Sequence, residues 1–301
     1  MNKLGFGFLR LPKLGESYDW DTISKMADLY MENGGNYFDT CYTYLDGNSD
    51  IAIKKCVSDR KARSSFRLAQ KLPGYSCKSD EDLQRYFDES LTRCGVEFFD
   101  VLMLHCLSIR NFEIAEKYNQ FRFLQEKKAA GLAKRIGFSY HGNAALLDKI
   151  LTKHPEVDVV LLQINYLDWE SPKVQSRACY EVAVKHNKQV IIMEPVKGGT
   201  LVNLPEKAMQ ELKGVSPANY AIRFAASFPN VFMVLSGMSN MEQMMDNVKT
   251  FTEDKPLSEE ETALLMEIAE GMKDSIPCTA CRYCCDGCPA GLDIPGLIST
   301  Y

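Results

Sequence analysis

The stretch DVLMLHC, residues 100–106, decides the fold class of this chain. Its apolar side chains follow one another without polar alternation, which is typical of a strand buried on both faces of a parallel sheet. A polar residue, His105, stands near its carboxyl end. Seven further runs with little or no polar alternation occur at residues 4–9, 37–41, 66–71, 133–140, 159–166, 189–195 and 231–238.

Amphipathic stretches separate these runs, as in DWDTISKMADLYMENG (19–34), where apolar residues recur at three- and four-residue spacing before a glycine stop. Eight strand–helix units within about 250 residues predict a (β/α)8 TIM barrel. The main alternative is a doubly wound sheet with a dinucleotide fingerprint after its first strand. The pattern G-x-G-x-x-G follows none of the runs, so the barrel is favoured.

Composition limits the class of protein. The chain has 301 residues, 46% hydrophobic and 25% charged, as in an ordinary globular enzyme. A formal net charge of −5 gives no basic stripe, which counts against nucleic acid as a partner. No apolar run approaches the ~20 residues that cross a bilayer. The amino-terminal segment lacks a signal-peptide pattern, so we expect a cytoplasmic protein without a membrane partner.

Ionisable side chains stand where three consecutive strands should end. They are Asp39 with Tyr44 five residues on, then Lys71, then His105. Barrel enzymes carry their catalytic groups at the carboxyl ends of strands, so these four side chains should share one pocket. The set suggests proton transfer by the phenol, because a neighbouring ammonium held by a carboxylate favours phenolate. A plain ion pair and a polar rim histidine are the simpler interpretations.

The segments NYFDTCYTY (36–44), LAQKLP (68–73), DVLMLHC and IGFSYHG (136–142) resemble the aldo-keto reductase family, in order through residues 4–250. The resemblance implies an NAD(P)-dependent oxidoreductase that moves a hydride between nicotinamide and a small carbonyl or alcohol substrate. It implies that Tyr44 is the general acid, that Asp39 and Lys71 tune it, and that His105 positions the substrate carbonyl.

The same resemblance implies a coenzyme, NADP or NAD, lying across the barrel mouth. Ser139 and Gln163 fall where the family holds the carboxamide. The segment SGMSNMEQMMDN (236–247) matches the adenosine-phosphate segment of the family. The contacts that this match implies are Gly237, Ser239, Asn240, Gln243 and Asn247.

Two departures from the family pattern concern the coenzyme. Glu194 and Pro195 stand where many members carry a Tyr-Ser pair, which removes an aromatic ring from the nicotinamide side. Gly237, Asn240 and Gln243 occupy the neighbourhood of the usual 2′-phosphate clamp and are not basic. Near these positions, only Lys197 and Lys249 carry positive charge. We therefore expect weak discrimination between NADP and NAD.

A cysteine run near the carboxyl end, C-x2-C-x2-C-x3-C-P, predicts an iron–sulfur site. Its cysteines are Cys278, Cys281, Cys284 and Cys288. The alternative is zinc, but structural zinc sites usually separate two cysteine pairs by a dozen or more residues. Four thiolates on one short loop suit a [4Fe–4S] cluster better. Cys285 lies outside the register of this run.

The run resembles the branch of aldo-keto reductases with a carboxyl-terminal ferredoxin-like domain, which usually carries two such motifs. Only one is present here, so we expect a truncated appendage. The expected organisation is a barrel at 1–250, a linking helix at 251–275 with a capping box at Ser258 and Glu261, and an incomplete iron–sulfur segment at 276–301.

Two functions of different classes compete. The first is the oxidoreductase described above, with the cluster passing electrons to a redox protein partner. The second is a redox-sensing or electron-transfer module that uses the barrel as a scaffold. The set Asp39, Tyr44, Lys71 and His105 favours the enzyme, because a scaffold has no need of four such residues at strand ends.

Overall fold

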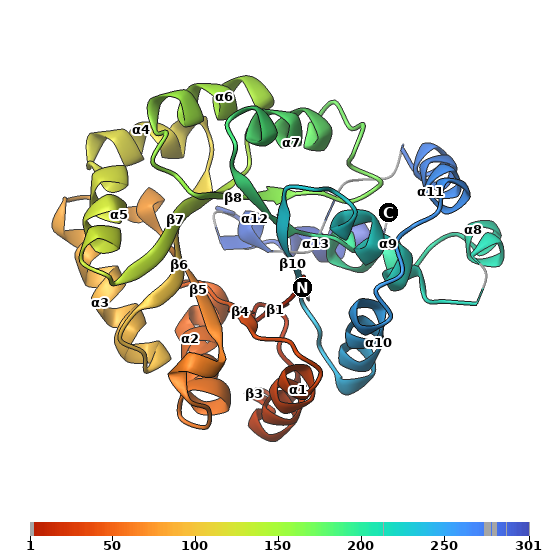
Figure 1. The fold of residues 1–301 in the computed structure, drawn as a ribbon, viewed down its shortest axis with the longest axis horizontal. Coiled ribbons are helices and arrows are strands. Elements are labelled where there is room, and N and C mark those ends of the chain that lie inside the picture. Colours follow the sequence, from red (N-terminus) through yellow and green to blue (C-terminus); the bar gives the residue numbers. More distant parts are fainter. Residues whose placement is uncertain (1–2, 213, 274–277, 279–281, 287, 301) are drawn as a thin grey trace.

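Eight parallel strands form a closed barrel in the computed structural model, and helices surround it (Figure 1). The structure describes residues 3–212, 214–273, 278, 282–286 and 288–300. The barrel strands are β1 (Leu4–Gly7), β4 (Tyr37–Asp39), β5 (Arg67–Leu72), β6 (Phe99–Leu107), β7 (Ala133–Tyr140), β8 (Val159–Gln163), β9 (Gln189–Met193) and β10 (Val231–Ser236). A short antiparallel pair, β2 (Lys13–Leu14) and β3 (Ser17–Tyr18), follows β1.

Each barrel strand pairs with its neighbours in the chain, and β10 pairs with β1 to close the ring. All eight runs that the sequence indicated form strands, which confirms the (β/α)8 barrel. Five of them end earlier than the apolar runs do, because the backbone leaves the ladder as it enters the loops at the carboxyl ends. Glu194, for example, takes φ of 57° directly after β9. The residues that follow these strand ends belong to the candidate active site.

Helices cover the outside of the sheet and return the chain to the start of the next strand. They are α1 (Trp20–Glu32), α2 (Asn48–Ile53), α3 (Glu81–Cys94), α4 (Ile109–Lys117), α5 (Gln120–Ala129), α6 (Ala144–Lys153), α7 (Ser176–Lys185), α8 (Glu206–Glu211), α9 (Pro217–Ala226), α10 (Met241–Thr252) and α11 (Glu259–Gly271). Two further helices, α12 (Tyr283–Asp286) and α13 (Ile294–Thr300), come last.

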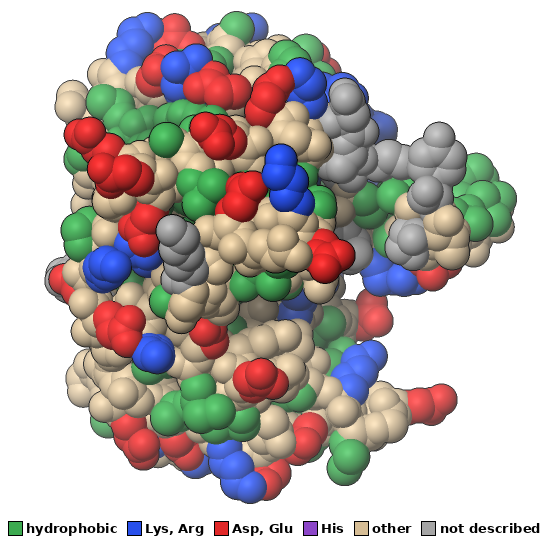
Figure 2. Space-filling view, turned by 90° about the vertical axis from the view of Figure 1, so that its right-hand side faces the viewer, with side chains coloured by type: hydrophobic (Ala, Val, Ile, Leu, Met, Phe, Trp, Pro, Cys, Tyr) green, Lys and Arg blue, Asp and Glu red, His purple; other side chains and the backbone are tan. Residues whose placement is uncertain are grey.

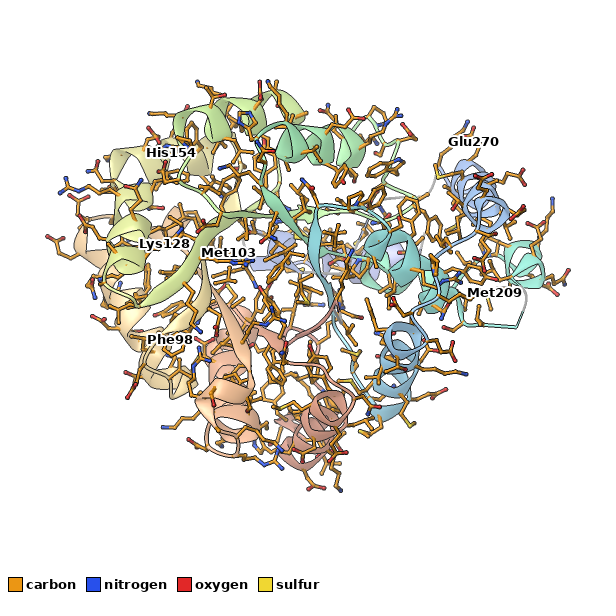
Figure 3. The ribbon with its side chains drawn as sticks, in the orientation of Figure 1. Phe98, Met103, Lys128, His154, Met209 and Glu270 are labelled. Atoms are coloured by element: carbon orange, nitrogen blue, oxygen red, sulfur yellow. The ribbon has the colours of Figure 1, made fainter. Side chains whose placement is uncertain are left out.

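The core has two layers because successive strand residues face opposite sides of the sheet. In β6, Val101 and Met103 belong to the cluster inside the barrel, whereas Leu102 and Leu104 belong to the cluster under the helices. Figure 3 shows Met103 near the middle of the barrel and Lys128 in the outer ring. Apolar packing on both faces explains why the strand sequences do not alternate.

The helix that follows the eighth unit packs against the barrel. Ser258 and Glu261 form the expected capping box at the start of α11. Glu261 also accepts hydrogen bonds from Arg223 of α9, and Leu265 is buried in the outer core cluster. Among the described residues, none of the helices has the length and hydropathy needed to cross a membrane. On the face drawn in Figure 2, the coloured acidic and basic side chains are interspersed.

Candidate active site

A cavity of about 870 Å³ opens at the carboxyl ends of the barrel strands. Its size is in the range that holds a small organic ligand or cofactor. Besides β6, which carries His105, six strands contribute lining residues at or near their carboxyl ends: Gly7 of β1, Asp39 of β4, Ser139 of β7, Gln163 of β8, Met193 of β9 and Ser236 of β10. Tyr44 and His105 line it as well. Three of the four side chains that the sequence placed in one pocket therefore line the same cavity.

The fourth, Lys71, lies behind the cavity wall and is completely buried. Its ammonium forms an ion pair with the Asp39 carboxylate and donates to the Thr40 carbonyl at 2.7 Å. Burial raises the pKa of Asp39, and the Lys71 ammonium opposes that rise. The Lys71 nitrogen also lies 4.9 Å from the centre of the Tyr44 ring. The ammonium therefore contacts both the carboxylate and the aromatic ring.

Tyr44 is placed by a tight turn after β4. Its backbone N–H donates to the Cys41 carbonyl at 3.0 Å, and the next two residues, Leu45 and Asp46, both take φ of 55°. Residues other than glycine rarely adopt this left-handed backbone conformation, and such strain often marks a functional site. The Tyr44 ring meets the His105 ring edge-on, with 5.8 Å between the ring centres.

His105 is buried, and its surroundings favour the uncharged imidazole. Burial lowers the pKa of His105 well below its ordinary value, and the nearby Lys71 ammonium and His141 lower it further. The Nδ1 atom of His105 lies 3.2 Å from the Cys41 sulfur, and that sulfur lies 3.4 Å from the Thr43 hydroxyl. Burial raises the pKa of Cys41 to about 11, so the sulfur is a thiol at neutral pH.

Gln163 is held by a buried ion pair. Its amide nitrogen donates to Asp168 Oδ2 at 2.8 Å, and Asn165 donates to the same oxygen at 2.8 Å. The other oxygen of Asp168 pairs with Lys197, whose side chain is also buried. Because the amide nitrogen is engaged with Asp168, the Gln163 side chain presents its oxygen away from that carboxylate.

The segment 236–247 lies along the cavity, but several of its side chains are engaged with its own backbone. The Asn240 side chain caps α10 by accepting from the backbone N–H of Gln243 at 2.9 Å. The Gln243 side chain accepts from the backbone N–H of Ser239 at 2.8 Å. The side-chain amide of Asn247 donates to the Ser236 hydroxyl at 2.7 Å. Gly237, Ser239, Asn240, Gln243 and Asn247 all line the cavity.

Charges along the cavity differ from those that the sequence suggested. Lys197 is buried with Asp168, and Lys249 faces a helical neighbour, Glu253, at 3.7 Å. Neither lines the cavity, whereas Arg10, from the loop after β1, does. The side-chain carbons of Arg10 come within 3.4 Å of the position that a Cβ on Gly237 would take.

Carboxylates also reach the cavity. Glu194 lines it directly after β9, and burial raises the pKa of this carboxyl while the Arg10 charge opposes the rise. Glu242 and Asp246, both from α10, line the end formed by the segment 236–247. That end of the cavity is therefore acidic, apart from Arg10.

The cysteine run lies only in part within the described residues. Cys278 and Cys288 are partly buried and Cys284 is exposed, while Cys281 lies outside the described residues. The backbone amides of Leu292, Ala290 and Gly291 lower the pKa of the Cys288 thiol. Within the described parts of the chain, no three His, Cys, Asp or Glu side chains gather as metal ligands.

Sequence reasoning missed Cys41, Asp168, Lys197 and Arg10 as members or supports of the site. Cys41 follows Asp39 by two positions, but a single cysteine beside an apolar strand is more often a small hydrophobic residue. The others stand in loops after strands, where a charged residue is ordinary. A charged residue directly after an apolar run is the signal that could have found Arg10, which follows the run 4–9.

A barrel with its cavity at the carboxyl ends of the strands, lined by a Tyr, an Asp and a His beside a buried Lys, defines an enzyme of the TIM-barrel class. The chain matches the model of the aldo/keto reductase family over residues 3–213 and 203–270. It therefore belongs to the aldo/keto reductase family and is an NAD(P)-dependent oxidoreductase.

Solved structures with the same fold include the holo form of an aldo-keto reductase from Bacillus halodurans. It is 22% identical, with a TM-score of 0.71, over 88% of this chain and 91% of that one. An aldo-keto reductase from Klebsiella pneumoniae in complex with NADPH is 15% identical, with a TM-score of 0.71, over 89% and 90%. A structure of an aldo/keto reductase from the same organism with NADP and acetate is 16% identical, with a TM-score of 0.71, over 89% and 91%.

Proposed function

We propose that the enzyme exchanges a hydride between a nicotinamide dinucleotide and a small carbonyl or alcohol substrate, with Tyr44 as the acid–base group. The observation that carries this proposal is the convergence of Asp39, Tyr44 and His105 on one cavity, with Lys71 buried directly behind them. When bound, the reduced coenzyme would supply the hydride to the carbonyl carbon.

The residues of the cavity fit such a dinucleotide. Asp39 Oδ2 is buried and has no hydrogen-bond partner among the described residues, so a ribose hydroxyl could donate to it. The oxygen of Gln163 and the hydroxyl of Ser139 suit a carboxamide, which both donates and accepts. Arg10 is the cation best placed for a phosphate, because it lines the cavity beside the segment 236–247.

In the reducing direction, Tyr44 gives its hydroxyl proton to the carbonyl oxygen as the hydride reaches the carbon. The product is an alcohol, and the phenolate left on Tyr44 takes a proton from solvent. The Lys71 ammonium favours that phenolate by its charge, and Asp39 holds the ammonium in place. Neutral His105 orients the carbonyl oxygen.

We propose weak discrimination between NADP and NAD. Glu242 and Asp246 at the adenosine end would repel a 2′-phosphate. Arg10 would attract the phosphates that link the two nucleosides, which NADP and NAD share. The NADPH and NADP in the Klebsiella structures belong to those proteins, which are too distant to decide the preference of this chain.

We also propose that Cys278, Cys281, Cys284 and Cys288 hold a [4Fe–4S] cluster. The spacing carries this proposal, and the amides that favour a thiolate at Cys288 fit it, because thiolate is the ligating form. When bound, the cluster would supply one-electron transfer to a redox protein. A cytoplasmic location remains a prediction from the sequence.

The test is oxidation of NADH and NADPH by protein purified without oxygen, against a panel of aldehydes and ketones. Tyr42→Phe is the matched control for Tyr44→Phe, because the Tyr42 hydroxyl instead donates to Glu89 at 2.6 Å. We expect Tyr44→Phe alone to lose carbonyl reduction. Equal activity of both variants would contradict the proposal.

A further inference from the structure

The thiol of Cys41 occupies a position that the proposed chemistry leaves without a role. It lies two residues after Asp39, is fully buried, and contacts a ring nitrogen of His105 rather than apolar side chains alone. A sulfur 3.2 Å from Nδ1 is within hydrogen-bond distance, so one of the two atoms donates to the other. The direction of that hydrogen bond decides which nitrogen of the neutral ring carries the proton.

Two directions are open to the chain of groups Thr43, Cys41 and His105. In the first, the Thr43 hydroxyl donates to the sulfur and the thiol donates to Nδ1. In the second, Nδ1–H donates to the sulfur and the thiol donates to the hydroxyl oxygen. Each direction makes two hydrogen bonds among these three groups, so counting bonds does not separate them.

The strengths of the acceptors do separate them. An unprotonated imidazole nitrogen is a strong acceptor, whereas a thiol sulfur is a weak one. The sulfur accepts one hydrogen bond in either direction, but the first direction gives the thiol hydrogen to the basic ring nitrogen, whereas the second gives it to the hydroxyl oxygen, a weaker acceptor. The first direction is therefore the more stable one, and it leaves the ring proton on Nε2.

We propose that Cys41 is a positioning residue that fixes His105 as the Nε2–H tautomer by donating its thiol hydrogen to Nδ1. The inference rests on the proposed function for its consequence, because an Nε2–H group can donate to a carbonyl oxygen and an unprotonated Nε2 cannot. Cys41 itself touches neither substrate nor coenzyme in this scheme. It acts through the histidine.

The test is a long-range ¹H–¹⁵N correlation spectrum of ¹⁵N-histidine-labelled protein near neutral pH. The chain has four histidines, and His105→Gln identifies the signals of His105. We expect a pyridine-like shift at Nδ1 and a pyrrole-like shift at Nε2. Cys41→Ser should keep this pattern, because a hydroxyl can also donate to Nδ1, and Cys41→Ala should replace it with a mixture of tautomers.

Kinetics give a second readout. Loss of one neutral hydrogen bond predicts that Cys41→Ala lowers kcat for carbonyl reduction by roughly 3- to 10-fold, with rescue by Cys41→Ser. Cys56→Ala is the matched control, because Cys56 is equally buried but contacts the Trp20 carbonyl instead.

The spectrum tests the role of Cys41, and the activity tests the proposed function. A pyrrole-like Nδ1 in the wild-type spectrum, or an unchanged pattern in Cys41→Ala, would overturn the role of Cys41 whatever the activity. An inactive protein with the expected tautomer would instead contradict the proposed function. If Cys41→Ala does not fold, the wild-type and Cys41→Ser spectra still decide the matter.

Discussion

Replacing Lys71 with methionine would separate the ion pair behind the cavity from the packing around it. Methionine keeps a long apolar stem in a fully buried position, so the main loss is the charge. Asp39, which is 2% exposed, would then hold a buried carboxylate without its cation. Removing one partner of a buried pair costs about 3–5 kcal/mol, because the remaining charge is left uncompensated. We expect the free energy of unfolding to fall by about that amount at about pH 8.

The loss should depend on pH, and its sign follows from Asp39. Burial already raises the pKa of this carboxyl in the folded protein, and removing Lys71 takes away the charge that opposes the rise. A folded pKa above the unfolded value means that the folded state takes up the proton first as pH falls. The variant should therefore recover stability below the folded pKa and lose it as pH rises through that pKa.

Urea unfolding of Lys71→Met at several pH values, followed by circular dichroism, measures this effect. The double variant Asp39→Asn/Lys71→Met is the control, since it removes both charges and should regain much of the lost stability at about pH 8. In the single variant Lys71→Met, carbonyl reduction should fall by roughly 10²- to 10⁴-fold, and the group that controls the rate should titrate at higher pH. Wild-type stability at about pH 8 together with an unaltered pH–rate profile would refute the reasoning.

Four other predictions concern the coenzyme, the phenol and the carboxyl-terminal segment. Tyr44→Phe should abolish carbonyl reduction while coenzyme affinity, measured by fluorescence titration, stays near wild type; unchanged turnover would remove Tyr44 from the mechanism. Arg10→Met should weaken NADH and NADPH binding alike, by roughly ten- to hundredfold, because each loses a charged hydrogen bond; a thousandfold preference of the wild type for NADPH would contradict the proposed weak discrimination. Deletion of residues 275–301 should leave the thermal unfolding of the barrel almost unchanged, because the core described here is made by residues before that segment; an unfolded product would show that the segment is integral to the barrel. Protein purified without oxygen should contain iron and sulfide for at most one cluster, and Cys288→Ser should lower that content; iron unaffected by Cys288→Ser would mean that Cys288 is no ligand.

The sequence by itself determined the barrel. Its eight apolar runs, without polar alternation, require burial on both faces, and only a parallel sheet covered by helices provides that. The ends of these runs likewise placed Asp39, Tyr44, Lys71 and His105 together, and three of the four side chains line one cavity. Strand periodicity and short motifs are local properties, so they can be read from neighbouring residues.

Only the tertiary structure decided which charges reach the cavity and which support it. Lys197 stands close to the site in the sequence, yet it pairs with Asp168 from another loop and is buried. Arg10 reaches the segment 236–247 because β1 pairs with β10 when the barrel closes, and that pairing joins the two ends of the sheet. The contact of Cys41 with His105 likewise joins residues 64 positions apart. Such contacts depend on strand order and register, which the spacing of residues along one chain does not encode.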